Sequence, residues 1–566
     1  MKRLSPVVVV LAALVILVGT IATQVAVGGS TTPITPGAAT PRWVIHVANY
    51  PGGISNGVRA SLAAQEESGA LGAAPRAQAP TSTSGGDSAN RGSNVKMNDN
   101  SYPPMPQNET AVAYNVDDPA IAVAATNDYV GGGVTVMRTS NGGRKWLTTR
   151  VNPQFRGTGD FCSGGDPGVA YSRKDGAFYI SQLCFFRASS FSEVHVFKSV
   201  DNGKTWTPGR QAARAASNFD YVTHTVDDSI FNDKELIAVD NNPSSPHYGR
   251  IYVTYTKFHM LPNGFSDYCP IQLSYTDSIP TTNPVLSIWS HTAIQPDQPG
   301  GDGTGSSADQ FSDPVVEKNG TLDVGFVSED CNDSFDPQLL FQKSTDGGQT
   351  FLATAVQIDK PGQYMDFLDF ARDDTLPPTH FRAPNTPSLA YSPTTGTLLY
   401  VYQNNINRAI SQADISYQTS TDGGLHWSNS KFLSTDSSGK PAANDQFFPA
   451  AAADEAGRFY VIWFDRRLDP ANVRINTWQA VSRNDAASFS SAKISSQDWN
   501  PNNGFFTSGG FIGDYNALAT STEAVYPVWT DGRDSARAQT GIGNTDIFTN
   551  VQRPANDDVN NGQNNP

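Results

Sequence analysis

The sequence predicts an all-β fold, a β-propeller built from four-stranded antiparallel blades, on the strength of three observations. A turn-like octapeptide recurs along the chain, a longer strand-turn-strand unit surrounds it, and the 566 residues include 49 Gly and 37 Pro, which suit many short strands and turns. About seven units of roughly 55 to 80 residues fit the chain, as expected for blades with long loops. We therefore expect seven blades, with six as the alternative.

The recurring octapeptide, called the marker, has a Ser or Thr, then Asp or Asn two residues later, a Gly and a final aromatic residue. Its Asp or Asn can accept hydrogen bonds from the following backbone N–H groups, and its Gly can take a left-handed conformation. The aromatic residue then packs inward, so the marker predicts a hairpin turn and not a catalytic element. The Asp and the aromatic residue of the three close copies are Asp201 and Trp206, Asp346 and Phe351, and Asp422 and Trp427. A looser copy has Asn141 and Trp146, and a decayed fifth copy spans 482–489.

The N-terminus predicts export. Lys2 and Arg3 precede an apolar run from Val7 to about Val18, which is the layout of a secretory signal. The apolar stretch extends to roughly 20 residues, so an uncleaved membrane anchor is the alternative for residues 1–27. We expect a secreted or extracellular protein that is either free or tethered by this segment.

Composition divides the rest of the chain into three parts. Residues 28–106 are rich in Ala, Gly, Ser, Thr, Pro and Gln, which predicts a low-complexity linker in which only 43–47 resembles a strand. Residues 107–553 carry the repeats and form the predicted propeller. Residues 554–566 are rich in Asn and Asp, which predicts a disordered tail.

Each predicted unit starts with a small apolar strand, passes a short turn and enters a β-branched and aromatic strand. The first unit starts near Glu109 and the last near Tyr515, and little chain follows the last strand near Asp546. An unpaired edge strand invites aggregation, so we expect a strand before Glu109 to complete the last blade and close the ring. The paired strands of the other units are 167–171 with 177–180, 237–240 with 250–255, 314–316 with 322–327, 387–391 with 397–402, and 449–453 with 458–463.

The connections between strands differ on the two faces of the predicted ring. One face carries short turns and every marker, whereas the opposite face carries the long loops, where binding residues concentrate on rigid scaffolds. All four cysteines fall on this long-loop face. An even number of cysteines in an exported chain suggests disulfides, and the unit alignment predicts the pairs Cys162–Cys184 and Cys269–Cys331.

The charge balance excludes one class of partner. The formal net charge is −15, which argues against a nucleic-acid backbone or an anionic membrane surface as the main partner. Membrane contact is expected only through the N-terminal segment. The eight histidines lack metal-ligand spacing, so no cofactor is expected, with Ca²⁺ at the Asp cluster 366–374 as the one candidate ion.

Arginine and carboxylate residues gather at predicted strand ends on the long-loop face. Residues 463–467 read Trp-Phe-Asp-Arg-Arg, residues 529–534 read Trp-Thr-Asp-Gly-Arg-Asp, and residues 381–384 read Phe-Arg-Ala-Pro. Arginine binds planar carboxylates bidentately, and clustered carboxylates can divide into acid and base. The alternative is that these repeated pairs are ion pairs between blades, with a structural role only.

The markers resemble the Asp-box, or BNR, repeats of sialidases and related β-propellers, and the resemblance covers about residues 107–553. The fold that it implies also carries non-enzymatic functions. Family sialidases hold the substrate carboxylate with three arginines and use an Asp as acid/base and a Tyr, assisted by Glu, as nucleophile. The family's first Arg lies in an early Phe-Arg-Ile-Pro motif, whereas the Phe-Arg-Ala-Pro of this chain lies in the fifth unit.

The resemblance implies a glycan site on the long-loop face. We expect a surface module that binds glycans or other carbohydrates, with an exo-glycosidase of the exo-α-sialidase kind, acting on terminal acidic sugars, as the alternative. For the enzyme, the resemblance implies anion-clamping arginines, an acid/base carboxylate and a nucleophile. The expected anion-clamping arginines are Arg382, Arg466 and Arg533. The expected acid/base is Asp514 or Asp465, and the expected nucleophile is Tyr515.

Overall fold

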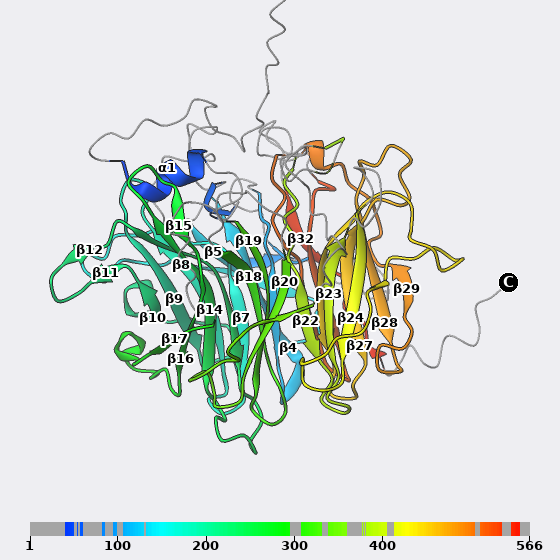
Figure 1. The fold of residues 1–566 in the computed structure, drawn as a ribbon, viewed down its shortest axis with the longest axis horizontal. Coiled ribbons are helices and arrows are strands. Elements are labelled where there is room, and N and C mark those ends of the chain that lie inside the picture. The colour runs from blue at the N-terminus through cyan, green and yellow to red at the C-terminus, as the bar shows by residue number, and fades with distance from the viewer. Residues whose placement is uncertain are drawn as a thin grey trace, which may run out of the picture.

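The computed structural model is a ring of seven antiparallel sheets, called blades 1 to 7 in chain order, which confirms the predicted seven-bladed β-propeller (Figure 1). The structure describes residues 40–49, 54, 57–59, 82–84, 94–98, 106–129, 132–294, 307–330, 338–358, 376, 378–379, 381–404, 413–503, 510–534 and 545–554.

Each blade has four main strands, ordered from the channel to the rim. In that order, blades 1 to 3 contain β3 (Ala111–Asn115), β4 (Asp118–Asp128), β5 (Gly133–Thr139) and β6 (Trp146–Val151); β7 (Gly168–Ser172), β8 (Ala177–Phe185), β9 (Ser192–Ser199) and β10 (Ala213–Ser217); and β13 (Ile230–Val239), β14 (Ile251–Met260), β16 (Ile271–Thr276) and β17 (Ser290–Ala293). Blades 4 to 6 contain β18 (Ser307–Val316), β19 (Leu322–Asp330), β20 (Gln338–Ser344) and β21 (Val356–Gln357); β22 (Ser388–Tyr391), β23 (Leu398–Asn404), β24 (Asp414–Ser420) and β25 (Lys431–Phe432); and β26 (Gln446–Ala453), β27 (Phe459–Asp465), β28 (Asn476–Ser482) and β29 (Ser490–Lys493). Blade 7 contains β30 (Ala517–Thr520), β31 (Val525–Asp531), β32 (Asp546–Thr549) and β2 (Val95–Lys96).

Three short additions extend the blades. β1 (Ser82–Ser84) pairs with the outer edge of blade 1, β15 (Ser266–Tyr268) pairs with β14, and β11 (Phe219–Asp220) with β12 (Thr225–Val226) forms a separate hairpin between blades 2 and 3. This hairpin projects from the left edge of the ring in Figure 1.

The core lies between the blades. Every residue of β27 is buried, because blades pack against both of its faces, and this explains the unbroken apolar and aromatic run of the strand. Tyr417 and Val401 of blade 5, for example, share one apolar cluster with Trp463 and Val461 of blade 6. Blade-to-blade packing of this kind makes the ring rigid.

The ring closes as predicted, by an N-terminal strand. β2 pairs antiparallel with β32 and becomes the outer strand of blade 7. The side chain of Asn98 donates to Asp546 Oδ1 at 2.9 Å and accepts from the N–H of Ile547 at 2.8 Å, while Lys96 Nζ lies 2.7 Å from Asp546 Oδ2. The two distant ends of the propeller are thereby joined in one sheet.

All five marker copies, including the decayed one, form the same turn between the third and fourth strands of a blade. In the second copy, Ser199 Oγ donates to Asp201 Oδ1 and accepts from the N–H of Gly203, both at 2.9 Å. The N–H of Thr205 donates to Asp201 Oδ1, also at 2.9 Å. The equivalent bonds recur in blades 1, 4, 5 and 6.

The expected strand at residues 43–47 is wrong, because this stretch belongs to the helix α1 (Arg42–Asn49). Pro41 precedes the helix, which is a favourable start, and its carbonyl accepts the first helical hydrogen bonds. Trp43 and His46 lie on the buried side while Ala48 is exposed, which is helical and not strand spacing. In Figure 1, α1 lies on the long-loop face, inside the range that composition assigns to a linker.

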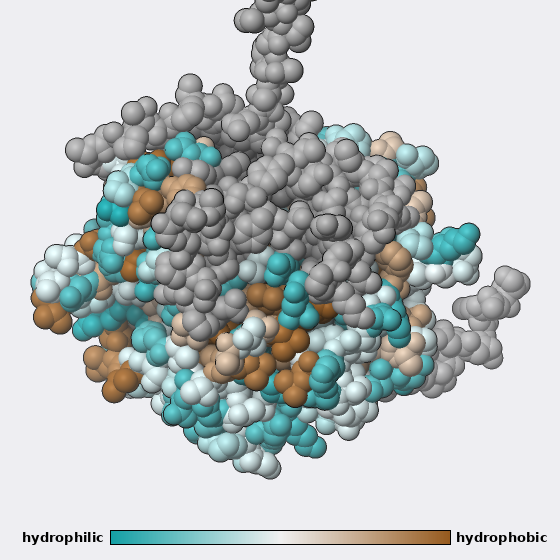
Figure 2. Space-filling view, in the orientation of Figure 1, coloured by the Kyte–Doolittle hydropathy of each residue, from teal (hydrophilic) through white to brown (hydrophobic). Residues whose placement is uncertain are grey.

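Figure 2 shows hydrophilic and apolar groups mixed on this face, with apolar groups at its left edge and near the centre of its lower half. Val222 of the β11–β12 hairpin and Ile288 of blade 3 are highly exposed. Among the described residues, no helix is long and apolar enough to span a membrane. Residues 1–39 and 555–566 lie outside the described part, so the signal or anchor and the disordered tail stay predictions.

Candidate functional site at the channel mouth

The inner strands of all seven blades surround a central channel with a cavity of about 360 Å³. Small residues such as Ala111, Gly168, Ala451 and Ala517 line its wall, which leaves the channel open. Each inner strand begins on the long-loop face, so residues just before these strands surround one mouth of the channel. Lys234, Phe311 and Tyr515 line the cavity there.

The backbone takes an unusual conformation at this mouth in several blades. Glu109, Asp166, Lys234, Phe311 and Phe448 all have φ between 52° and 58°, the left-handed region that non-glycine residues seldom adopt. In blades 3, 4 and 6 these residues lie at register shifts between the first two strands. Bulges of this kind re-aim side chains, and strained backbone tends to gather at functional sites.

The side chains of Glu109, Asp166, Lys234, Asp514 and Tyr515, called the axial cluster, meet at this mouth. Lys234 Nζ of blade 3 lies 2.9 Å from Asp514 Oδ2 of blade 7, 3.2 Å from Glu109 Oε1 of blade 1 and 3.3 Å from Asp166 Oδ2 of blade 2. It also lies 4.9 Å from the ring centre of Tyr515. One ammonium group thus joins four blades.

The axial cluster is shielded from solvent, and this determines its protonation. The side chain of Lys234 is 4% exposed and those of Glu109 and Asp166 are 0% exposed. Burial first, and then the charge of Asp166, raise the pKa of Glu109 well above its usual range, and the two carboxyl groups hydrogen-bond to each other. These surroundings therefore favour the protonated form of Glu109, in which its proton is shared with Asp166.

Lys234 nevertheless stays charged. Burial alone would lower the pKa of Lys234, but the neighbouring carboxylates, first Asp166 and then Asp514, outweigh burial and raise it well above its usual range. With Glu109 protonated, two carboxylates face one ammonium group. The axial cluster consequently favours neutral or cationic ligands over anionic ones.

Asn127 of β4 positions the two carboxyl groups. Its Oδ1 accepts from the N–H of Asp166 at 2.7 Å, and its Nδ2 donates to Glu109 Oε2 and, at 2.9 Å, to the hydroxyl of Tyr129. Tyr129 in turn donates to Asn108 Oδ1 at 2.8 Å. Aside from the proton shared with Glu109, no described donor hydrogen-bonds to the side-chain oxygens of Asp166.

Two of the six site residues predicted from the sequence, Asp514 and Tyr515, lie in the axial cluster. Burial first, and then the surrounding acidic groups, raise the pKa of Tyr515 well above its usual range, so its phenol is neutral. The carboxylate of Asp514 forms an ion pair with Lys234.

The other four predicted residues do not line the cavity. Arg466 is fully buried between the rings of Phe381 and Phe447, where it donates to Thr379 at 2.6 Å, and burial lowers its pKa to about 10. Arg533 pairs with Asp531 and lies over the ring of Phe548. Arg466 and Arg533 therefore contact different residues. Arg382 is 7% exposed and does not line the channel wall.

The Trp-x-Asp-x-Arg strand ends form ion pairs within a blade and not between blades. Asp465 accepts from Trp463 Nε1 at 2.8 Å and from Arg467 Nε at 2.9 Å. The second copy repeats this arrangement in blade 7, where Asp531 binds Trp529 and Arg533. In both copies the Arg also stacks on an aromatic ring, so the motif fastens the end of a strand.

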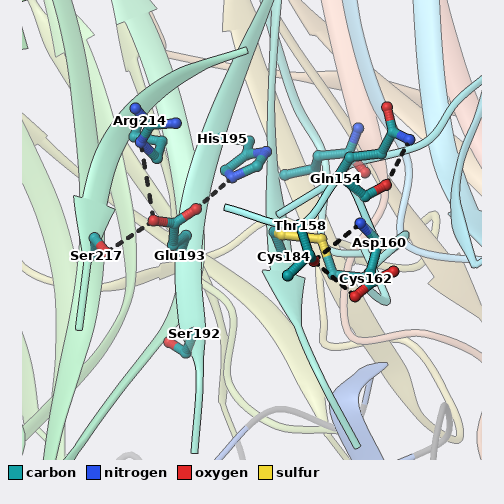
Figure 3. The surroundings of a disulfide bond; sticks show 12 residues. Gln154, Thr158, Asp160, Cys162, Cys184, Ser192, Glu193, His195, Arg214 and Ser217 are labelled. Carbon is teal, nitrogen blue, oxygen red and sulfur yellow. Dashed lines mark hydrogen bonds and ion pairs between the residues drawn. A yellow bond between two sulfur atoms is a disulfide. The ribbon is translucent and has the colours of Figure 1, made fainter. Parts of the chain in front are cut away.

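The disulfide Cys162–Cys184 is formed as predicted. Cys331, the predicted partner of Cys269, lies outside the described residues, as does the Asp cluster 366–374 that was the candidate for Ca²⁺. Figure 3 shows a second buried polar group beside the disulfide, in which Glu193 Oε2 lies 2.8 Å from His195 Nε2. The sulfur of Cys184 is close to both residues, but the disulfide removes it as a thiolate ligand for a metal.

The sequence interpretation missed Glu109, Asp166 and Lys234 as site residues. No local motif marks them, since each comes from a different blade. What these residues share is their position. Glu109 and Asp166 each lie two residues before an inner strand, and Lys234 lies at the bulge of the inner strand β13. Charged residues at that point of several units, next to apolar strands, could have indicated them.

No protein-family model and no curated protein matches the chain. Similar solved structures include a Penicillium chrysogenum α-L-arabinanase complexed with arabinobiose, at 13% identity over 69% of this chain and 93% of that chain, with a TM-score of 0.40. The Hadza microbial sialidase Hz136 matches at 12% identity over 85% and 96%, with a TM-score of 0.40. A Dyadobacter fermentans protein of unknown function matches at 11% identity over 71% and 97%, with a TM-score of 0.42. Such identities do not transfer residue roles.

Proposed function

We propose that the protein binds carbohydrate at the long-loop mouth of its channel, through the axial cluster. The observation that carries this proposal is the carboxylate of Asp166, which is buried beside Lys234 and lacks a hydrogen bond from any described N–H or alcohol. Sugar hydroxyls supply such donors, and the ring of Tyr515 offers a surface for the apolar face of a sugar. Because two carboxylates face one ammonium group, a neutral sugar is favoured over an acidic one.

A second candidate function is hydrolysis of a glycosidic bond, and it is supported by the proton shared between Glu109 and Asp166. Glycosidases pair a carboxylic acid, which protonates the leaving oxygen, with a carboxylate that acts as base or nucleophile. Glu109 has the raised pKa that the acid needs. This role fits Glu109 better than Asp514, which Lys234 holds at 2.9 Å.

The proposal also includes kinship with Asp-box propellers and export from the cell. Kinship with Asp-box propellers is supported by the marker turns, which share one hydrogen-bond pattern in five blades. Export is supported by the disulfide Cys162–Cys184, because structural disulfides persist in oxidising compartments.

The test is carbohydrate binding by the full chain, measured on a glycan array and then by calorimetry at millimolar ligand. We expect neutral oligosaccharides to bind, and Asp166→Asn to weaken binding at least about tenfold, which is the scale of one lost charged hydrogen bond. Asp436→Asn, at an exposed turn, is the control and should bind normally. Binding that is equal in wild type and Asp166→Asn would contradict the site.

Hydrolysis is tested with fluorogenic glycosides of neutral sugars and with a fluorogenic sialoside. Glu109→Gln should abolish turnover of any hydrolysed substrate while retaining binding, because the amide keeps the shape but cannot supply the proton. Absence of turnover by wild type together with retained binding would eliminate the enzyme and leave the binding module.

A further inference from the structure

We propose that the N-terminal segment made of α1, Ile54 and residues 57–59 is an autoinhibitory plug, which closes the axial cluster and must be displaced before a ligand enters. The ligand part of this statement rests on the proposed function, whereas the closure itself rests on packing alone.

Gly57 lies directly on the carboxyl groups of the axial cluster. A methyl group built on its Cα would lie 2.6 Å from Glu109 Oε2, closer still to Asp166 Oδ1, and 3.2 Å from Asn127 Nδ2. The backbone of this segment therefore occupies the volume that a ligand on Asp166 would need. A side chain at this position would overlap both carboxyl groups where they now stand, so one of the two elements would have to move.

The plug covers Asp166 without bonding to it. Gly57 has no side-chain donor, and the oxygens of Asp166 receive no hydrogen bond from a described N–H or alcohol. The proton shared with Glu109 and the ammonium group of Lys234 replace only part of the water that the plug removes from Asp166, and such incomplete replacement is unfavourable for a carboxylate. The closed arrangement must be held by contacts elsewhere, and a ligand that satisfies Asp166 would compete with the plug.

Those contacts lie to one side, on blades 2 and 3. Trp43 stacks on Phe231 at a ring-centre distance of 5.0 Å, meets Phe185 edge-on at 5.5 Å, and donates from Nε1 to the carbonyl of Ser189 at 2.8 Å. Ile54 and Val58 are buried in the same apolar cluster. Trp43 is the main anchor of the plug.

His46 ties the two parts of the plug together. Its Nδ1 lies 2.8 Å from the carbonyl oxygen of Gly264, and the N–H of Ile54 donates to its Nε2 at 3.3 Å. Arg59 Nε donates to the carbonyl of Ile54 at 3.1 Å. Because the described contacts of this fastening lie on blades 2 and 3 while the axial cluster spans blades 1, 2, 3 and 7, the plug can leave these contacts without taking the ring apart.

The test is carboxyl footprinting of the full chain with a carbodiimide and glycine ethyl ester, read by mass spectrometry. In wild type, Glu109 and Asp166 should be protected relative to the exposed carboxylate of Asp436. Trp43→Ala, which removes the anchor, should raise their labelling rate at least about tenfold, the effect of 1.4 kcal/mol on an opening equilibrium. Gly57→Leu places a bulky side chain against the two carboxyl groups, which displaces the other end of the plug, and it should also raise their labelling rate.

Two controls exclude general unfolding. Ala48→Ser changes an exposed residue of α1 and should label like wild type. Asp323, buried in blade 4, should stay protected in every variant. Continued protection of Glu109 and Asp166 in both plug variants would overturn the proposal. Faster labelling without carbohydrate binding would uphold the plug and contradict the proposed function.

Discussion

Each titratable side chain around the channel mouth takes its protonation state from burial and from the charge beside it. Glu109 and Lys234 are both enclosed, yet their surroundings favour the neutral form of Glu109 and the charged form of Lys234. The difference arises because two carboxylates remain next to the lysine and favour its ammonium form, whereas the same neighbours oppose a further negative charge on Glu109. One site therefore holds an acid, a carboxylate and a cation together.

His46 gives the plug a dependence on pH. Burial first, and then the charge of Arg59, lower the pKa of His46 to about 3 from an ordinary value of about 6.5. As pH falls from about 6.5 towards 3, protonation therefore favours the displaced segment, by up to about 1.4 kcal/mol per pH unit. The raised pKa of Glu109 acts in the opposite direction, because a carboxyl group whose pKa burial raises in the closed form favours that form as the pH falls.

The histidine contribution is isolated by comparing wild type with His46→Gln, because Glu109 is common to both. Glutamine keeps a donor and an acceptor but cannot gain a charge. We expect hydrogen exchange of α1 to lose protection below about pH 6.5 in wild type relative to His46→Gln. Peptides of β27 serve as the internal control for global stability. Identical pH profiles of α1 in the two proteins would rule out His46 as the sensor.

Among the elements, the marker turns hold neighbouring blades together. A methyl group on the marker glycine Gly424 would overlap the ring of Phe341 in the preceding blade, and one on Gly348 would overlap Leu273. The closing aromatic residues do likewise, since Trp427 meets the ring of Phe341 edge-on at 5.5 Å. The marker is thus both a turn and a contact between blades.

This double role predicts different effects of the same substitution at two glycines. Gly424 and Gly439 have φ of 84° and 78°, but only Gly439 has free space where a Cβ would stand. Gly439→Ala should cost about 1 kcal/mol, from left-handed strain alone. Gly424→Ala should cost about 2 kcal/mol more, because of overpacking. Midpoints of urea unfolding measure both, and equal shifts would show that the marker glycine serves the turn only.

The elements also show where sequence reasoning holds. The marker turns and the Cys162–Cys184 pair were predictable, because hairpin chemistry is local and the repeat fixes which loops are neighbours. The helix α1 was not, because a short segment in a low-complexity region owes its conformation to burial of Trp43 between Phe185 and Phe231. Such tertiary contacts override weak local preferences.

At the scale of the whole molecule, the ring makes one site from residues that the chain keeps far apart. Glu109 and Asp514 are separated by most of the propeller, yet both bind Lys234, because closure through β2 and β32 brings blade 7 against blade 1. The sequence indicated the closure, and two of the residues that it proposed for a site, Asp514 and Tyr515, lie in the axial cluster. It did not indicate that Lys234 joins these groups, because which blades face each other across the channel is a property of the closed ring.

Lys234 is therefore also a cross-ring tie, and Lys234→Met tests this role. Removing the ammonium leaves three carboxyl groups buried without a counter-charge, which should lower the free energy of unfolding by about 3 to 5 kcal/mol at neutral pH. The loss should shrink as the pH is lowered, since the carboxylates then take up protons in the folded variant.

Unfolding by urea at neutral pH and near pH 5 measures the effect. Lys234→Met with Asp514→Asn should recover part of the lost stability, because one buried charge is removed with its partner. The comparison variant is Lys343→Met, whose lysine pairs with Glu317 within blade 4 and should not respond to Asp514→Asn. A loss at Lys234 that is independent of pH and unrelieved by Asp514→Asn would mean that the lysine acts through packing and not as the charge that joins four blades.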